Sequence, residues 1–338
     1  MSQLPPYLFG MINKMKMERR HNGEDVIDLG MGNPMDPAPD DVIGKLCEVA
    51  QDPKTHRYPV TGGMQHLRRE IALYYKRNYV VDLHSEDEFL RRITAMCESL
   101  TPAPRLLMLN YPHNPTGTLA SREFFSQIVD LAKRYGLMVV NDFAYARVTF
   151  DGYTAPSFLE VPGAMDVGVE FGSFSKSYNM AGWRVGYCVG NPKIIEGLGK
   201  IKGYYDYGIF SPIQIADIVA MRDCEEDIVT QARLYQNRRD VMCEGLTRMG
   251  WPVAKPLAGM FVWVKIPEPW CRMGSVKFAV EMMEQANVAV TPGAGFGEEG
   301  DGYLRLALVE NENRIRQGLK QMRRALTEME KELQPNNR

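Results

Sequence analysis

The chain has 338 residues, of which 45% are hydrophobic and 24% charged, and its 40 basic and 42 acidic side chains leave a net charge of −2. This length predicts more than one core, and the near-neutral charge argues against a nucleic-acid partner or a polybasic membrane patch. The apolar runs are too short to cross a bilayer. Six scattered cysteines without C-x-x-C indicate reduced thiols in a cytoplasmic protein, and the dispersed histidines offer no metal site.

The middle third of the chain alternates short apolar runs with helical patterns. Residues 24–34, EDVIDLGMGNP, are typical of a strand entering a loop. Strands follow at 105–110, 137–143, 167–174 and 184–190, and a helix at 122–135 has Ser121 as its cap and Gly136 as its stop. Strand, helix and strand at this spacing predict a parallel α/β sheet, in which ligands bind at the carboxyl ends of strands.

The pattern changes at about residue 200. Long helical stretches are predicted at 212–248, 274–286 and 311–333, with strand-like runs at 259–266, 288–292 and 303–309 between them. This mixture predicts a smaller α+β domain. We therefore expect residues 1–35 to form an arm that joins the smaller domain, 36–200 to form a large domain, and 201–338 to form the smaller one.

Two motifs have weak functional interpretations. Residues 293–300, GAGFGEEG, match G-x-G-x-x-G, but Pro292 precedes them and a strand-like run follows, so an ordinary glycine turn is favoured. Ser173 and Lys176 in SFSK match the S-x-x-K pattern of penicillin-binding proteins. The S-D-N and K-T-G elements that complete that pattern do not occur in this chain.

Lys176 has two other interpretations, a solvated surface charge and an amine that holds a carbonyl cofactor. A lysine in a crowded, partly apolar pocket has a lowered pKa, and its neutral amine can attack an aldehyde. A pyridoxal cofactor also needs a phosphate site, for which Ser173 and Arg184 are near in sequence. Singly these residues are weak evidence, but together they are more specific.

The pyridine ring of such a cofactor needs two kinds of partner. Its nitrogen needs a carboxylate that keeps it protonated, and Asp142 ends a predicted strand. Its ring oxygen needs hydrogen-bond donors, and Tyr145 and Asn114 stand at predicted loop ends. These positions predict that the three side chains gather around one ring.

Several longer stretches resemble the class I/II aminotransferases, which are pyridoxal 5′-phosphate (PLP) enzymes of fold type I. The resemblance is carried by NYPHNPTG (110–117), NDFAYARVTFDG (141–152), SFSKSYNMAGWRVGYCVGN (173–191) and YLRLALVENENRIRQGL (303–319). Residues 27–36 and 55–75 are similar to N-terminal segments of the same family. The subgroup that looks most similar contains the bacterial alanine and LL-diaminopimelate aminotransferases. The resemblance implies an α/β fold with a large parallel or mixed sheet domain and a smaller α+β domain.

The resemblance also implies a role for each matching residue. Lys176 would form the Schiff base with PLP and shuttle the proton during catalysis. The cofactor would be bound by Asn114, Asp142, Tyr145, Ser173, Lys176, Arg184 and Tyr58, and the substrate by Arg305, Gly32, Asn33 and Asn114. Arg305 would bind the substrate α-carboxylate, for which a guanidinium on a strand provides a planar fork. Tyr58 would reach the phosphate of a neighbouring subunit, which implies a homodimer with shared active sites.

One segment of the family pattern is missing near residues 88–98. In the family, a long segment there holds a helix whose N-terminus binds the phosphate and an aromatic side chain that stacks on the ring. In this chain only FLRRITAMCE joins the flanks, which makes the large domain incomplete and predicts exposed apolar edges and faces in its sheet.

The resulting hypothesis is a PLP-dependent aminotransferase that moves an amino group from an amino acid to a 2-oxo acid. An alanine-, glutamate- or diaminopimelate-like donor fits the resemblance. Two alternatives are a PLP-dependent β-lyase, which needs the same lysine and ring partners, and a catalytically impaired scaffold that lacks its phosphate-binding segment. The expected partners are the amino acid and 2-oxo acid substrates and the second subunit, without a nucleic acid or a membrane.

Overall fold

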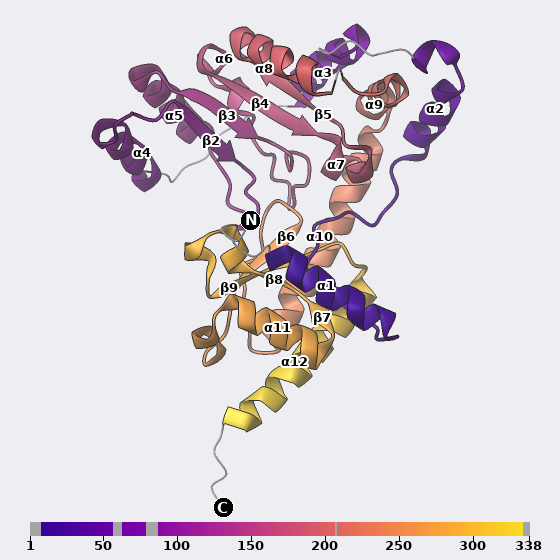
Figure 1. The fold of residues 1–338 in the computed structure, drawn as a ribbon, viewed down its shortest axis with the longest axis vertical. Coiled ribbons are helices and arrows are strands. Elements are labelled where there is room, and N and C mark those ends of the chain that lie inside the picture. The colour runs from indigo at the N-terminus through magenta and orange to yellow at the C-terminus, as the bar shows by residue number, and fades with distance from the viewer. Residues whose placement is uncertain (1–7, 57–62, 79–86, 207, 334–338) are drawn as a thin grey trace, which may run out of the picture. The chain divides into compact units, whose positions relative to one another are not determined.

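The computed structural model describes residues 8–56, 63–78, 87–206 and 208–333 (Figure 1). The chain divides into two compact units, which we describe separately. The terminal unit comprises residues 1–35, 114–117 and 234–338, and the large-sheet unit comprises residues 36–113 and 118–233. The domain bounds expected from the sequence stay a prediction.

The large-sheet unit is built on a four-stranded sheet with the order β2-β3-β4-β5 (Figure 1). Its strands are β2 (Leu106–Asn110), β3 (Met138–Asp142), β4 (Gly168–Ser173) and β5 (Gly186–Gly190). Its helices are α2 (Asp40–Ala50), α3 (Gln65–Asn78), α4 (Asp87–Ser99), α5 (Arg122–Tyr135), α6 (Ala164–Val167), α7 (Phe174–Ser177), α8 (Pro192–Tyr205) and α9 (Ser211–Asp223). The segment at the predicted interruption forms α4.

The sheet is mixed. Strands β2, β3 and β4 are parallel, whereas β5 is antiparallel to β4. The connection from β4 to β5 holds only the short helix α7 and a 3₁₀ turn at Ala181–Trp183. A parallel return needs a crossover long enough to carry the chain back along the sheet, and a helix of four residues does not do this. The predicted strand is therefore present but reversed.

Helix α5 begins and ends at the predicted residues. The Ser121 hydroxyl accepts a hydrogen bond from the Phe124 amide at 3.1 Å, and Gly136 ends the helix in the left-handed conformation with φ 66°. Its apolar side belongs to a core cluster that also contains Leu109 of β2 and Val139 of β3. One face of the sheet is therefore covered by α5.

The opposite face of β2 and β3 is open. Strand side chains alternate between faces, and Leu106, Met108 and Met138 on this face are 49%, 69% and 46% exposed. Strand β2 also lies at the edge of the sheet. These exposed apolar residues are the feature expected of a large domain that lacks part of its family's structure.

The terminal unit holds two small sheets. Strand β1 (Ile27–Asp28) pairs in parallel with β7 (Val288–Ala289), and the second sheet has the order β6-β9-β8. The strands of the second sheet are β6 (Phe261–Lys265), β8 (Thr291–Pro292) and β9 (Tyr303–Ala307). The helices that lie wholly within the unit are α1 (Leu8–His21), α11 (Ser275–Ala286) and α12 (Glu312–Leu333). The glycine-rich loop forms two 3₁₀ turns, at Gly293–Phe296 and Glu298–Gly300, which confirms the ordinary turn.

The helix predicted at 212–248 is in fact two helices. Helix α9 ends at Asp223, and α10 (Glu225–Arg248) begins two residues later. Three acidic residues, Glu225, Glu226 and Asp227, form the first turn of α10, where they interact favourably with the positive end of the helix dipole. The apolar periodicity continues across Cys224, which is why the sequence pattern alone did not reveal the break.

Candidate active site

Three predicted site residues lie at one end of the sheet in the large-sheet unit. Asp142 is the last residue of β3, and Ser173 is the last residue of β4. Because β3 and β4 are parallel, with Asp142 in register with Phe171, both carboxyl ends meet at the same edge. Lys176 is half-buried and lies in α7, which starts directly after β4.

Arg184 is brought to the same edge by the antiparallel strand β5. The Phe174 amide donates to the Val185 carbonyl at 3.4 Å, and Ser173 is in register with Gly186. Arg184 has a left-handed backbone with φ 56°, which is costly for a side chain other than glycine, and its guanidinium donates to the Ala181 carbonyl at 2.9 Å. A strained backbone conformation of this kind supports the hypothesis that Arg184 has a functional role.

The hydroxyl and carboxyl groups at this edge are held by their own backbone. The Ser173 hydroxyl accepts a hydrogen bond from the Ser175 amide at 3.1 Å, and the Asp142 carboxylate accepts one from the Ala144 amide at 3.1 Å. Packing around the carboxyl raises the pKa of Asp142, and the Ala144 amide partly offsets this. Three residues after Asp142, the Tyr145 side chain is buried.

Arg305 is the centre of a second group, in the terminal unit. It is only 7% exposed and lies on β9, between Thr291 of β8 and Trp263 of β6 in the strand register. Its guanidinium donates to the Asn114 side-chain oxygen and to the Gly30 carbonyl, each at 3.0 Å. A planar guanidinium with these bonds has a fixed orientation.

Two aromatic rings complete the surroundings of Arg305. The Arg305 guanidinium carbon lies 4.1 Å from the centre of the Phe261 ring and 4.8 Å from that of Phe296. Gly32 lies against the same Phe261 ring, because a Cβ atom built on Gly32 would be 2.6 Å from it. Only glycine therefore fits at position 32 while Phe261 stacks on Arg305.

The predicted site residues thus form two groups. Asp142, Tyr145, Ser173, Lys176 and Arg184 belong to the large-sheet unit, whereas Asn114, Arg305, Gly32 and Asn33 belong to the terminal unit. Asn33 is exposed, and Tyr58 lies outside the described residues.

Comparison with known proteins decides the family. The family profile for aminotransferase class I and II matches residues 78–322. The chain is 40% identical over 382 aligned positions to the glutamate-pyruvate aminotransferase AlaC of Escherichia coli K12, with 96% of this chain and 93% of AlaC covered. The chain is a class I/II aminotransferase.

Two further relatives agree with this family. An LL-diaminopimelate aminotransferase of Moorella thermoacetica is 37% identical, with 97% of this chain and 98% of the relative covered. The solved structure of substrate-bound BacF from Bacillus subtilis superposes with a TM-score of 0.85 and 28% identity, covering 95% of each chain. The aminotransferase is thus an α/β enzyme of fold type I that uses PLP.

The alignment with AlaC also shows that this aminotransferase is shorter than its relative. The alignment spans 382 positions, whereas the whole chain has 338 residues, so AlaC has residues for which this chain has no counterpart. An internal shortfall was predicted from the motifs, and its place near 88–98 stays a prediction.

The groups at the sheet edge fit PLP by their chemistry. The edge offers one amine, one carboxylate, one hydroxyl and one guanidinium, which match the aldehyde, the pyridine nitrogen and the phosphate of the cofactor. When bound, PLP supplies an electron sink for the carbanion that forms when the substrate loses its Cα proton. The residues present therefore suit the cofactor.

Sequence reasoning missed the two rings around Arg305. Phe296 is the one large side chain in the GAGFGEEG loop, and a bulky residue among glycines is a signal that it packs on something. Phe261 is two residues from Trp263, the register partner of Arg305, which only strand pairing reveals. Cross-strand neighbours become visible once the register is known.

Proposed function

We propose that this aminotransferase transfers the amino group of an α-amino acid to a 2-oxo acid, with a donor that resembles alanine, glutamate or diaminopimelate. Arg305 carries the proposal. It is a buried guanidinium with a fixed orientation, and such a group binds carboxylates, which all α-amino acids and 2-oxo acids contain. The names of AlaC and of the Moorella enzyme support the donor class.

Four residues of the large-sheet unit serve the cofactor in this proposal. Lys176 would hold PLP through its amine and would act as the acid and base for the proton at the substrate Cα. Asp142 keeps the proton on the pyridine nitrogen, because a carboxylate there stabilises the charged ring. Ser173 and Arg184 bind the phosphate, the first with a hydroxyl hydrogen and the second with its charge.

The remaining predicted residues orient the ring and the substrate. Tyr145 and Asn114 donate hydrogen bonds to the ring oxygen. The Asn114 side-chain oxygen already accepts from Arg305, so its amide nitrogen is the group that can donate. Gly32 and Asn33 lie beside the substrate, and Arg305 binds its carboxylate.

A homodimer with shared active sites is part of the proposal. Tyr58, outside the described residues, would reach the phosphate of the neighbouring subunit. The end of α8 supports association, because Ile201, Tyr204 and Tyr205 are 64%, 92% and 86% exposed there. Exposed apolar side chains in such a group mark an association surface.

The cytoplasmic location also stays within the proposal. All six cysteines are free thiols, which agrees with a reducing compartment. Within the described part of the chain, none of the helices combines the length and apolarity that a bilayer crossing requires.

The test is a spectroscopic titration of the purified aminotransferase with PLP. We expect a visible Schiff-base absorbance that Lys176→Ala abolishes. Lys202→Ala is the matched control, because Lys202 is a lysine of α8 whose partner is Asp206, the residue that caps the end of the same helix. A panel of amino donors with 2-oxoglutarate or pyruvate as acceptor then identifies the substrate pair.

Each outcome of this test has a defined meaning. A folded protein without lysine-dependent absorbance would refute the proposal and favour the impaired scaffold. A lysine-dependent absorbance together with release of pyruvate and free ammonia would favour the β-lyase. A transaminase would instead form the keto acid of the donor and pyridoxamine phosphate, without free ammonia.

A further inference from the structure

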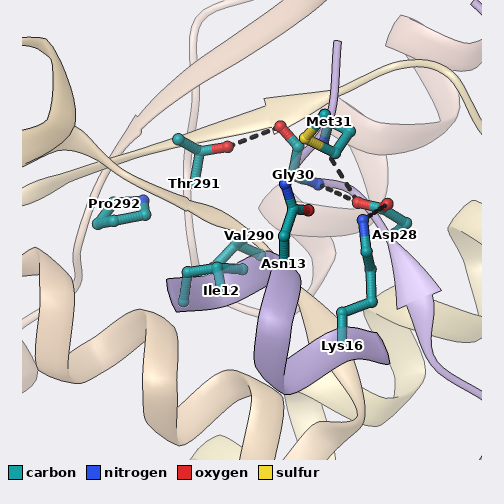
Figure 2. A pocket seen from close by; sticks show the side chains of 9 residues that line it. All are labelled: Ile12, Asn13, Lys16, Asp28, Gly30, Met31, Val290, Thr291 and Pro292. Carbon is teal, nitrogen blue, oxygen red and sulfur yellow. Dashed lines mark hydrogen bonds and ion pairs between the residues drawn. The ribbon is translucent and has the colours of Figure 1, made fainter. Parts of the chain in front are cut away.

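A largely buried ion pair in the terminal unit lies next to the loop that contacts Arg305, with side-chain exposures of 9% for Lys16 and 13% for Asp28. Lys16 of α1 is 7% exposed, and its amine lies 2.6 Å from the Asp28 Oδ2 atom at the end of β1. Figure 2 shows Lys16 extending from α1 toward Asp28, in the lining of a small pocket that also includes Gly30 and Thr291. The pair lies outside the set of groups to which the proposed reaction assigns a role.

The second oxygen of Asp28 shapes the chain that follows. Its Oδ1 atom accepts hydrogen bonds from the amides of Gly30 at 3.0 Å and of Met31 at 3.1 Å. A carboxylate that accepts from amides two and three residues later fixes a local turn. The two oxygens of Asp28 therefore have separate tasks, one toward Lys16 and one toward the backbone.

The turn determines where the Gly30 carbonyl points. This carbonyl accepts from the Thr291 hydroxyl at 2.7 Å and from the Arg305 guanidinium at 3.0 Å (Figure 2 shows the Thr291 bond). The Leu29 amide donates to the Ala289 carbonyl at 2.9 Å, which fixes the start of the loop on β7. A continuous chain of contacts thus runs from Lys16 through Asp28 and Gly30 to Arg305.

Stability alone does not explain this ion pair. The cost of removing two charges from water roughly cancels their attraction, so a buried pair is often no more stable than apolar residues of the same size. What such a pair can provide is a defined position for the atoms that it holds. Here those atoms include the Gly30 carbonyl, which accepts a hydrogen bond from the Arg305 guanidinium.

We propose that Lys16 and Asp28 are positioning residues that set the orientation of Arg305 toward the substrate carboxylate. The inference rests on the proposed role of Arg305. The ion pair holds the turn at 28–31, the turn holds the Gly30 carbonyl, and the carbonyl together with Asn114 holds the guanidinium plane. Substrate affinity therefore depends on two residues that do not contact substrate.

The experiment measures how tightly the holoenzyme binds two carboxylate ligands. L-Alanine reports KM and kcat, and propionate, which has the carboxylate but no amine, reports an inhibition constant. For Asp28→Ala we expect KM and the propionate constant to rise about tenfold or more, with kcat and the PLP absorbance nearly unchanged, because a misplaced guanidinium loses one charged hydrogen bond. Lys16→Met should give a smaller rise in both constants.

Conservative variants and a control separate positioning from general damage. Lys16→Arg should restore much of the affinity, because it keeps the charge. Asp28→Asn keeps an oxygen that can accept from the two amides but loses the ion pair. Its KM and propionate inhibition constant should lie between those of wild type and of Asp28→Ala. This variant also tests the proposal if Asp28→Ala does not fold. Lys14→Met is the matched control, because Lys14 lies on the same helix in an exposed pair with Glu18.

The outcomes distinguish this inference from the proposed function. Wild-type constants in folded Asp28→Ala, Asp28→Asn and Lys16→Met, with raised constants in Arg305→Ala, would overturn the positioning role and leave the proposed function intact. Unchanged constants in Arg305→Ala would instead refute the carboxylate role on which both depend.

Discussion

Arg305 and Asp217 are both buried ionisable residues, but their surroundings differ. Arg305 is 7% exposed and has Asn114, the Gly30 carbonyl and two aromatic rings around it. Asp217 of α9 is 0% exposed, and among the described residues neither of its carboxylate oxygens has a hydrogen-bond partner. Arg305 is thus surrounded by hydrogen-bond acceptors and aromatic rings, whereas the carboxyl group of Asp217 has no hydrogen-bond partner among the described residues.

The difference shows how a fold treats a charge that it uses and one that it does not. A buried guanidinium stays charged because its intrinsic pKa is very high, and around Arg305 the protein supplies hydrogen-bond acceptors and ring faces in place of water. A buried carboxylate without partners takes up a proton instead, and burial raises the pKa of Asp217 to about 8. Arg305 is thus prepared for a ligand of opposite charge, whereas Asp217 makes stability depend on pH.

The largest expected effect on substrate affinity comes from removing the charge of Arg305. Arg305→Ala should raise the KM for an α-amino acid by roughly two to three orders of magnitude, because two charged hydrogen bonds to a carboxylate are lost. Arg314→Ala is the control, because Arg314 pairs with Asp25 on the surface at 2.7 Å. Steady-state kinetics on both variants measure the difference, and equal KM values would refute the role of Arg305.

The next effect tests the unpartnered charge. The folded pKa of Asp217 lies above its unfolded value of 3.8, so between these two values the folded state holds a proton that the unfolded state has released. Stability should therefore fall as pH rises through this window, by about 1.4 kcal/mol per pH unit from this group. Asp217→Asn removes the titration, so its stability relative to wild type should increase from pH 4 to pH 8.

Urea unfolding at several pH values measures this prediction. The free energy of unfolding of Asp217→Asn minus that of wild type should rise with pH, since other groups titrate equally in both proteins. A difference that stays constant across the window would show that Asp217 is ionised in the folded protein.

A smaller effect tests the rings around Arg305. Phe296→Leu keeps an apolar side chain but removes one ring from the guanidinium, which costs about 1 kcal/mol and should raise KM about fivefold. Phe158→Leu is a suitable control for stability, because Phe158 is buried in the core cluster of the other unit. Phe158→Leu should lower the melting temperature and leave KM unchanged. Phe296→Leu should raise KM and leave the melting temperature nearly unchanged.

The smallest expected effect on stability comes from Met108, an exposed residue of β2. Met108→Ser on the open face of β2 should change the free energy of unfolding by less than about 0.5 kcal/mol, because Met108 is already 69% exposed. Leu109→Ala on the covered face should cost about 3 kcal/mol. Chemical unfolding measures both variants, and a large loss in Met108→Ser would show that this face is covered in solution.

The sequence by itself determined several strands and helices and the residue types proposed for the site. Local signals were sufficient for α5, where the Ser121 cap, the helical spacing and Gly136 agree with one another. They also placed Asp142 at the end of a strand, because the run LMVV precedes it. These features depend on contacts between residues that are near in sequence.

Only the tertiary structure decided the direction of β5, the break at Cys224 and the surroundings of Arg305. The groups around Arg305 come from positions 30, 114, 261 and 296, which are far apart in the chain, so their meeting depends on strand register and not on local pattern. For the same reason, the sequence revealed neither the pairing of Lys16 with Asp28 nor the lack of a hydrogen-bond partner for Asp217 among the described residues. The properties of an ionisable side chain depend on its burial and on its neighbours in space. Those neighbours can be far away in the sequence, so only the folded structure shows which they are.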